Sequence, residues 1–197
     1  MDDTHMGIDF GAKLAGTTAV AMVRDGALRL WQSEKGKDAD SWLLYLIAEL
    51  QPKVIFLDAP LSLPKVYARE AFTTASDFFY RQADREVQAM SPMFIGGLTA
   101  RAIKLRTQLA AQGIAVLETY PSQANRLLFP HLQGYKKSLA ALPTYAGALQ
   151  GLLSCPLPIP PANWHQVDAI LAWNSSYRHL HHQAILYGDP KEGVVIV

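Results

Sequence analysis

Hydrophobic and polar residues alternate at the start of the chain, in the pattern of strands with one buried face. In MGIDFG (6–11), apolar residues alternate with glycines and Asp9, which is the two-residue period of a β-strand. Two similar segments follow, separated by Asp25-Gly26, a dipeptide typical of hairpin turns. The pattern therefore predicts antiparallel strands over Met6–Gly11, Thr17–Arg24 and Ala27–Gln32.

The rest of the chain combines helical spacing with two continuous apolar runs. KVIFLDAP ends in Asp58 and GIAVLETYP ends in Glu118, as expected of parallel strands that are buried on both faces. Asn163 and Gln166 have the spacing of a capping box that opens a helix. The other predicted helices are Ala39–Leu50, Ala75–Met90, Leu98–Gln112, Ser122–Leu128 and Ala140–Leu153. AILYGDPKEGVVIV is predicted to close the chain as a hairpin.

This order of elements predicts an α/β fold with a mixed sheet. Antiparallel strands followed by strand–helix–strand crossovers give a mixed five-stranded sheet with helices on both faces, plus a C-terminal β-hairpin. That strand order is the RNase H-like architecture. Because 197 residues suit one domain with a full core, we expect 1–197 to be a single RNase H-like domain. A helical insertion is expected at about 60–97.

Composition and charge limit which partners and which cellular compartment we expect for this protein. The net charge of +1 provides no overall attraction to nucleic acid or a membrane surface, so any basic binding surface must be local. The single Cys155 excludes an internal disulfide and suits a reducing compartment. The acidic N-terminus does not resemble a signal peptide, and no apolar run is long enough to span a bilayer. We therefore expect a cytoplasmic protein with no membrane partner.

Five polar residues occupy positions where an α/β sheet binds ligands. Asp58 and Glu118 end apolar strands, and Asp9 lies in the first strand, although a buried carboxylate is costly unless it is paired or binds a metal. Asp168 lies in the second turn of the capped helix, and His165 shares its face. Such a carboxylate cluster needs a cation, and Mg²⁺ or Mn²⁺ prefers carboxylate oxygens. Two such ions can activate water for phosphodiester hydrolysis.

Each of these residues also has an ordinary structural interpretation. Asp58 could be a helix cap or turn residue, and Glu118 could be a solvated loop residue. His165 could be a surface or packing residue, and Asp168 could simply favour the dipole of its helix. The prediction of a metal centre therefore rests on the conjunction of these positions in one topology.

Several segments carry a resemblance to a known family. FLDAPLSLP, YRQADRE, LETYPS, HQVDAILAW and YGDPKEG resemble a domain-of-unknown-function family of predicted nucleases with the RNase H-like fold. GIDF and HQVDA are also similar to the first-strand and last-helix carboxylate motifs of Holliday-junction resolvases. The resemblance implies that Asp9, Asp58 and Asp168 are metal ligands, with Glu118 and His165 as secondary ligands or acid–base groups. Those resolvases usually have Glu where this chain has Asp58.

Basic residues supply candidates for phosphate binding. Arg81, Asp84 and Arg85 match a further motif of that family, and two arginines one helical turn apart suit a bidentate phosphate clamp. A structural Arg–Asp network is the alternative. Lys104 lies with Arg101 on a polar helix face and is a further candidate for phosphate binding, although such faces are usually solvated.

These observations favour a metal-dependent nuclease or phosphodiesterase. Its cofactor would be Mg²⁺ or Mn²⁺, and its partner nucleic acid or a phosphorylated small molecule. A second hypothesis is nucleotide or phosphate binding, because GIDFGAKLAGTT is similar to the first phosphate loop of actin-like ATPases and sugar kinases. Those proteins bind nucleotide between two such domains, so this chain would have to form a homodimer. A third is a non-catalytic binding scaffold with the RNase H-like fold.

Overall fold

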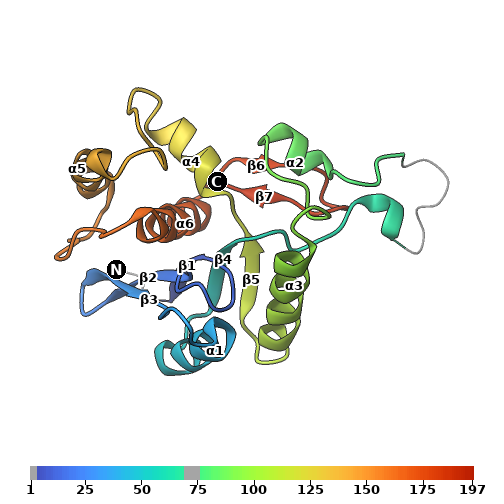
Figure 1. Cartoon of the computed structure of the whole chain (residues 1–197), viewed down its shortest axis with the longest axis horizontal. Coiled ribbons are helices and arrows are strands. Elements are labelled where there is room, and N and C mark those ends of the chain that lie inside the picture. Colours follow the sequence, from blue (N-terminus) through green and yellow to red (C-terminus); the bar gives the residue numbers. More distant parts are fainter. Residues whose placement is uncertain (1–3, 69–75) are drawn as a thin grey trace.

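A five-stranded mixed sheet lies at the centre of the protein (Figure 1). The computed structural model describes residues 4–68 and 76–197. The strands of the sheet are β1 (His5–Asp9), β2 (Ala19–Arg24), β3 (Ala27–Gln32), β4 (Val54–Asp58) and β5 (Ala115–Glu118). Their order is β3-β2-β1-β4-β5, with antiparallel pairing on the β3 side of β1 and parallel pairing on the β5 side. The predicted sheet is therefore confirmed.

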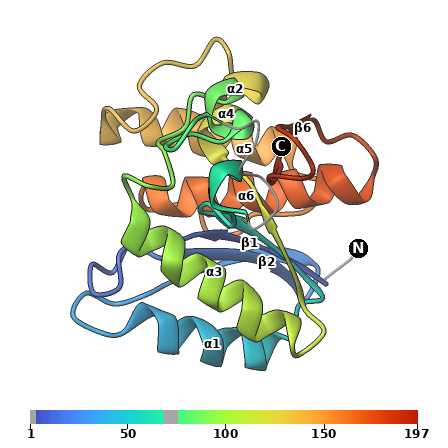
Figure 2. The same ribbon diagram turned by 90° about the vertical axis from the view of Figure 1, so that its right-hand side faces the viewer.

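Helices cover both faces of this sheet, as the crossover rule predicts (Figure 2). The helices of the described residues are α1 (Ala39–Leu50), η1 (Lys65–Tyr67), α2 (Gln82–Glu86), α3 (Gly96–Ala110), α4 (Pro121–Leu128), η2 (Leu139–Ala141), α5 (Leu142–Leu152) and α6 (Trp164–Leu180). One core lies between the sheet and α1 with α3, where Met6, Ile8 and Val20 are buried. The other lies under α6, where Ala19 and Ala21 are buried. Among the described residues, no helix has the length and apolar character needed to cross a membrane.

The helix α6 lies directly on the central strand because Gly7 has no side chain. A Cβ atom at Gly7 would lie 2.1 Å from the backbone nitrogen of Trp173 and 2.5 Å from the carbonyl oxygen of Ala169. Both are backbone atoms of α6 that cannot move aside locally. Gly7 therefore determines how closely the last helix approaches the first strand.

The segment between β4 and α3 is much less helical than the sequence predicts. The predicted helix Ala75–Met90 is wrong: Ala75 lies outside the described residues, and the α-helix extends only over Gln82–Glu86. The Asp77 carboxylate accepts hydrogen bonds from two backbone N–H groups that follow it, which stabilises a turn in competition with a helix. Gln88 then adopts a positive φ of 53° just after α2.

The C-terminal hairpin forms a separate two-stranded sheet and contacts the segment between β4 and α3. Its strands are β6 (Leu186–Tyr187) and β7 (Val195–Ile196), which pair antiparallel as predicted. Between them, the Glu192 carboxylate accepts hydrogen bonds from the backbone N–H groups of Lys65, at 2.7 Å, and Gln82, at 2.8 Å. The hairpin thereby fastens this segment beside the end of β4.

Candidate metal centre

Three carboxylates from separate elements converge at one edge of the sheet. Asp9 ends β1 and Asp58 ends β4, and the two residues are direct partners in the parallel register. Asp168 reaches the same edge from α6. One ligand oxygen from each residue lies within 4.8 Å of the others. The predicted convergence of these side chains is therefore confirmed.

The start of α6 is held by its cap, which places Asp168 in the second turn. The Asn163 side chain accepts a hydrogen bond from the Gln166 N–H at 3.1 Å. The Gln166 side chain accepts from the N–H of Ala162 at 2.7 Å, one residue before the position of a capping box. With its N-terminus held in this way and its middle against Gly7, α6 buries Asp168 completely.

Burial and neighbouring carboxylates make two members of the triad, Asp58 and Asp168, hard to ionise. Burial raises the pKa of Asp58 well above its ordinary value, and the neighbouring Asp9 and Asp168 raise it further. Burial raises the pKa of Asp168 to about 6, against the opposing effect of the Lys136 ammonium. A divalent cation would remove this penalty, and three oxygen ligands suit Mg²⁺ or Mn²⁺. The donor set therefore fits the predicted metal.

Two residues that sequence reasoning did not place in the site contact Asp168. The Tyr135 hydroxyl donates a hydrogen bond to Asp168 Oδ1, and Lys136 Nζ lies 2.5 Å from Asp168 Oδ2. Burial opposes the charged form of Lys136, but Asp168 and Asp58 raise its pKa above the ordinary value, so it stays protonated. Both residues lie in a loop with no regular spacing, and thus no periodic pattern indicates them.

His165 contacts the triad from the exposed side. Its Nδ1 lies 2.8 Å from Asp9 Oδ2, and 43% of its side chain is exposed. The hydrogen bond with Asp9 raises the pKa of His165, whereas partial burial opposes that increase. The structure therefore places a titratable group with solvent access next to the carboxylates.

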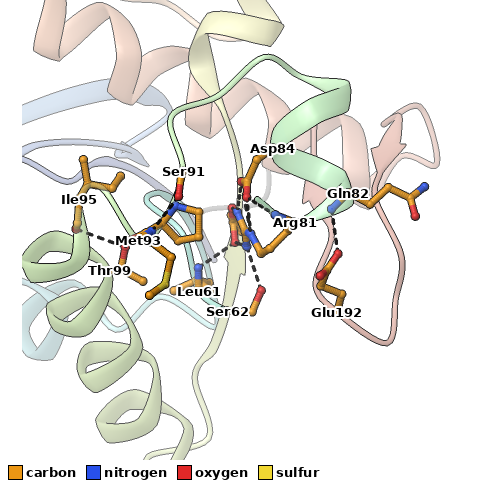
Figure 3. Close-up of polar contacts among 12 residues, drawn as sticks. Leu61, Ser62, Arg81, Gln82, Asp84, Ser91, Met93, Ile95, Thr99 and Glu192 are labelled. Carbon is orange, nitrogen blue, oxygen red and sulfur yellow. Dashed lines mark hydrogen bonds and ion pairs between the residues drawn. The ribbon is translucent and has the colours of Figure 1, made fainter. Parts of the chain in front are cut away.

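A second buried cluster is centred on Arg81, with Asp84 and Ser62 beside it (Figure 3). Glu118 belongs to this cluster. Arg81 donates hydrogen bonds to Asp84, Glu118 and Ser62. All five of its N–H groups are engaged in this way, and its side chain is 1% exposed. Glu118 also accepts from the Leu61 N–H at 2.8 Å. Burial raises the pKa of Glu118, while Arg81 opposes that shift.

A cavity of about 230 Å³ connects the two clusters. Asp9 and Asp58 line it together with Arg81 and Glu118, while most of the remaining wall is apolar. In the described part of the chain, the group of close ligand oxygens consists of the three aspartates, and Glu118 lies outside it. Glu118 therefore borders the same cavity as Asp9 and Asp58, while its two oxygens bind protein donors.

The structure does not bring Arg85 and Lys104 to this cavity, as far as the described residues define it. Arg85 forms an exposed ion pair with Asp77, and Lys104 is exposed on α3. Arg81 and Arg85, which are predicted one turn apart within a helix, do not both lie in α2. Arg81 is the extended N-cap of α2, with φ −78° and ψ 161°, and it binds Asp84 and Glu118, whereas Arg85 binds Asp77.

The sheet order, the two helical layers and the C-terminal hairpin define an α/β protein of the RNase H-like class. More particularly, the fold is similar to that of a solved Thermus thermophilus RuvC structure. The TM-score is 0.50 at 17% sequence identity, and the similarity covers 93% of this chain and 98% of that chain. The fold is therefore RuvC-like. No protein-family model and no curated protein matches the sequence.

Proposed function

We propose that this protein is a metal-dependent nuclease or phosphodiesterase. The observation that carries the proposal is the triad of Asp9, Asp58 and Asp168, whose ligand oxygens lie within 4.8 Å of one another. Like charges held this closely raise the free energy of the metal-free fold. A hard divalent cation would relieve that cost, with Mg²⁺ or Mn²⁺ as the expected ion. The RuvC-like fold supports the same proposal.

We propose a different role for each of the side chains around the triad. A divalent ion held by Asp9, Asp58 and Asp168 would supply Lewis-acid chemistry for phosphodiester hydrolysis. His165, hydrogen-bonded to Asp9 and partly exposed, would act as the acid–base group that exchanges protons with solvent. Glu118 would act as a positioning residue, because it holds the Leu61 N–H three residues after Asp58. Arg81, with no free N–H group, would hold Glu118 instead of a phosphate.

Nucleic acid is the substrate class that we propose. The motif resemblance to Holliday-junction resolvases and the similarity to RuvC support it. A phosphorylated small molecule is the alternative, and the same assay distinguishes the two. Homodimer formation stays a prediction that size-exclusion chromatography with light scattering would check.

The test compares the wild type with Asp9→Asn on single-stranded, duplex and branched DNA and RNA, and on a simple phosphodiester. Cleavage by the wild type should require Mg²⁺ or Mn²⁺ and stop with EDTA. Asp9→Asn should reduce the rate about a hundredfold or more, because the metal supplies several kcal/mol of charge stabilisation. Asp25→Asn, the same exchange in the exposed β2–β3 turn, is the matched control and should leave the rate unchanged.

Other outcomes would favour the other hypotheses. Equal cleavage by the wild type and Asp9→Asn would contradict the proposal, since the activity would then come from another site or a contaminant. Thermal stabilisation by nucleotides without cleavage would favour the actin-like or sugar-kinase-like hypothesis. No cleavage and no effect of metal on stability would favour a binding scaffold.

A further inference from the structure

Lys136 reaches from the protein surface into the carboxylate triad. Its Nζ lies 2.5 Å from Asp168 Oδ2, while 43% of the Lys136 side chain and 1% of the Asp168 side chain are exposed. Within the described residues, the ion pairs to the triad are this contact and the one between His165 and Asp9. A flexible cation with access to solvent therefore neutralises part of a buried anionic cluster.

The backbone conformation of the loop places Lys136 beside Asp168. Lys136 has a positive φ of 57°, an uncommon conformation for a residue with a side chain. Gly134, two residues earlier, has a φ of 90°, and its carbonyl oxygen accepts a hydrogen bond from the Lys137 N–H at 3.0 Å. A backbone conformation of this kind persists only where its surroundings enforce it. The turn therefore fixes the backbone of Lys136, while its side chain keeps its own rotational freedom.

Tyr135 anchors the same loop from the other side. Its ring packs 5.8 Å from that of Tyr145 and 5.5 Å from that of Trp164, between centroids. Its hydroxyl donates to Asp168 Oδ1. Consecutive residues thus bind the two oxygens of one carboxylate, the first through a packed aromatic ring and the second through a mobile side chain.

A metal ion that used Asp168 as a ligand would need one of these oxygens. The Tyr135 hydroxyl cannot withdraw without disrupting its aromatic contacts, whereas the Lys136 side chain can turn out into water. We propose that Lys136 is an internal counter-ion of the triad, which a divalent cation must displace from Asp168 in order to bind. This role of Lys136 rests on the proposed metal site, because Lys136 would control how readily a metal ion occupies that site. Lys136 would set the metal concentration at which the centre fills.

The test measures Mg²⁺ binding to the full-length protein without substrate. Each variant is stripped with EDTA and titrated with Mg²⁺ by calorimetry and by thermal denaturation. Lys136→Met keeps the length of the side chain and removes its charge, and Lys137→Met is the matched control on the exposed neighbouring lysine. Lys136→Met should bind Mg²⁺ about tenfold or more tightly than the wild type, because no ion pair with Asp168 has to be broken first. Lys137→Met should bind within about twofold of the wild type.

Stability provides a second readout. Without metal, Lys136→Met should melt at a lower temperature than the wild type, because the triad has lost its counter-ion, and Mg²⁺ should stabilise it by a larger increment. Lys136→Gln provides the same measurements if the methionine variant fails to fold. Unchanged or weaker Mg²⁺ binding by the charge-removed variant, beside a wild type that binds Mg²⁺, would overturn this inference and leave the proposed function intact. No Mg²⁺ binding by any of the proteins would overturn both.

Discussion

Asp58→Asn should make the metal-free protein more stable, although it removes a candidate metal ligand. Asp58 lies beside Asp9 in the parallel register, and burial raises its carboxyl pKa well above the ordinary value. A carboxyl whose pKa is raised by folding binds more protons in the native state than in the unfolded state. It therefore lowers stability progressively as pH rises through and above its unfolded pKa. The gain from Asp58→Asn should be largest at alkaline pH and should shrink towards pH 4.

The distances in the triad set the expected size of this effect. Two unit charges 4.8 Å apart repel by about 3 kcal/mol at an effective dielectric constant of about 20. Asp58 faces two such neighbours, but Lys136 and His165 offset part of the negative charge. We therefore expect a net gain of about 1–3 kcal/mol at pH 8. For a chain of this length, that gain corresponds to an increase in Tm of about 2–10 °C.

Calorimetric unfolding in EDTA, at pH 8 and at pH 5, checks this prediction. Asp25→Asn, in the exposed turn, should change Tm by about 1 °C or less at either pH. Added Mg²⁺ should raise the Tm of the wild type more than that of Asp58→Asn, because only the intact triad binds the ion fully. A lower Tm for Asp58→Asn at pH 8 in EDTA would refute the reasoning. An equal gain at both pH values would also refute it, because the gain would then not come from ionisation.

Two further predictions concern the packing around the centre, and urea unfolding measures both. Gly7→Ala should cost about 3 kcal/mol or more, because its Cβ atom would overlap the backbone of α6. Gly147→Ala, at an exposed position of α5 with no atom within 4 Å, should add about 0.5–1 kcal/mol of stability. Equal effects of the two substitutions would contradict the contact between Gly7 and α6. Arg81→Met should cost about 3–5 kcal/mol, since it leaves two carboxylates buried without their cation. Arg85→Met, at an exposed ion pair, should cost less than about 1 kcal/mol; a similar loss at both arginines would show that burial of Arg81 does not matter.

Much of the fold is predictable because its strands and helices have strong local patterns. Ala27–Gln32 and Ala39–Leu50 have the predicted bounds, since a hairpin turn and a helical apolar stripe mark them. The segment after β4 is different, because its conformation depends on distant partners. Arg81 meets Glu118, 37 positions away, and Glu192 lies 110 positions from the Gln82 N–H that it binds. Local periodicity carries no information on such contacts.

Some residues of the candidate site are likewise predictable from local patterns, and others depend on distant contacts. Asp9 and Asp58 are predictable because parallel strands end at one edge of a sheet, and Asp168 because its capped helix has to cover that sheet. The strand-end rule also brings Glu118 to the cavity but cannot reveal that Arg81 occupies both of its oxygens. The contact of Lys136 with Asp168 is not predictable for another reason. In the sequence, a lysine in an irregular loop cannot be distinguished from a solvated surface lysine, and only the three-dimensional structure shows its contact.

The contact between β1 and α6 makes the centre depend on residues that are far apart in the sequence. His165 and Asp9 lie 156 positions apart, so a very large loop has to close before their side chains meet. Contacts at such separations reduce folding rates. In a partly folded molecule that has formed only the β2–β3 hairpin, Asp168 is not yet beside Asp9, and α6 does not yet cover β1. The centre can therefore be active only in molecules in which α6 has already packed against β1.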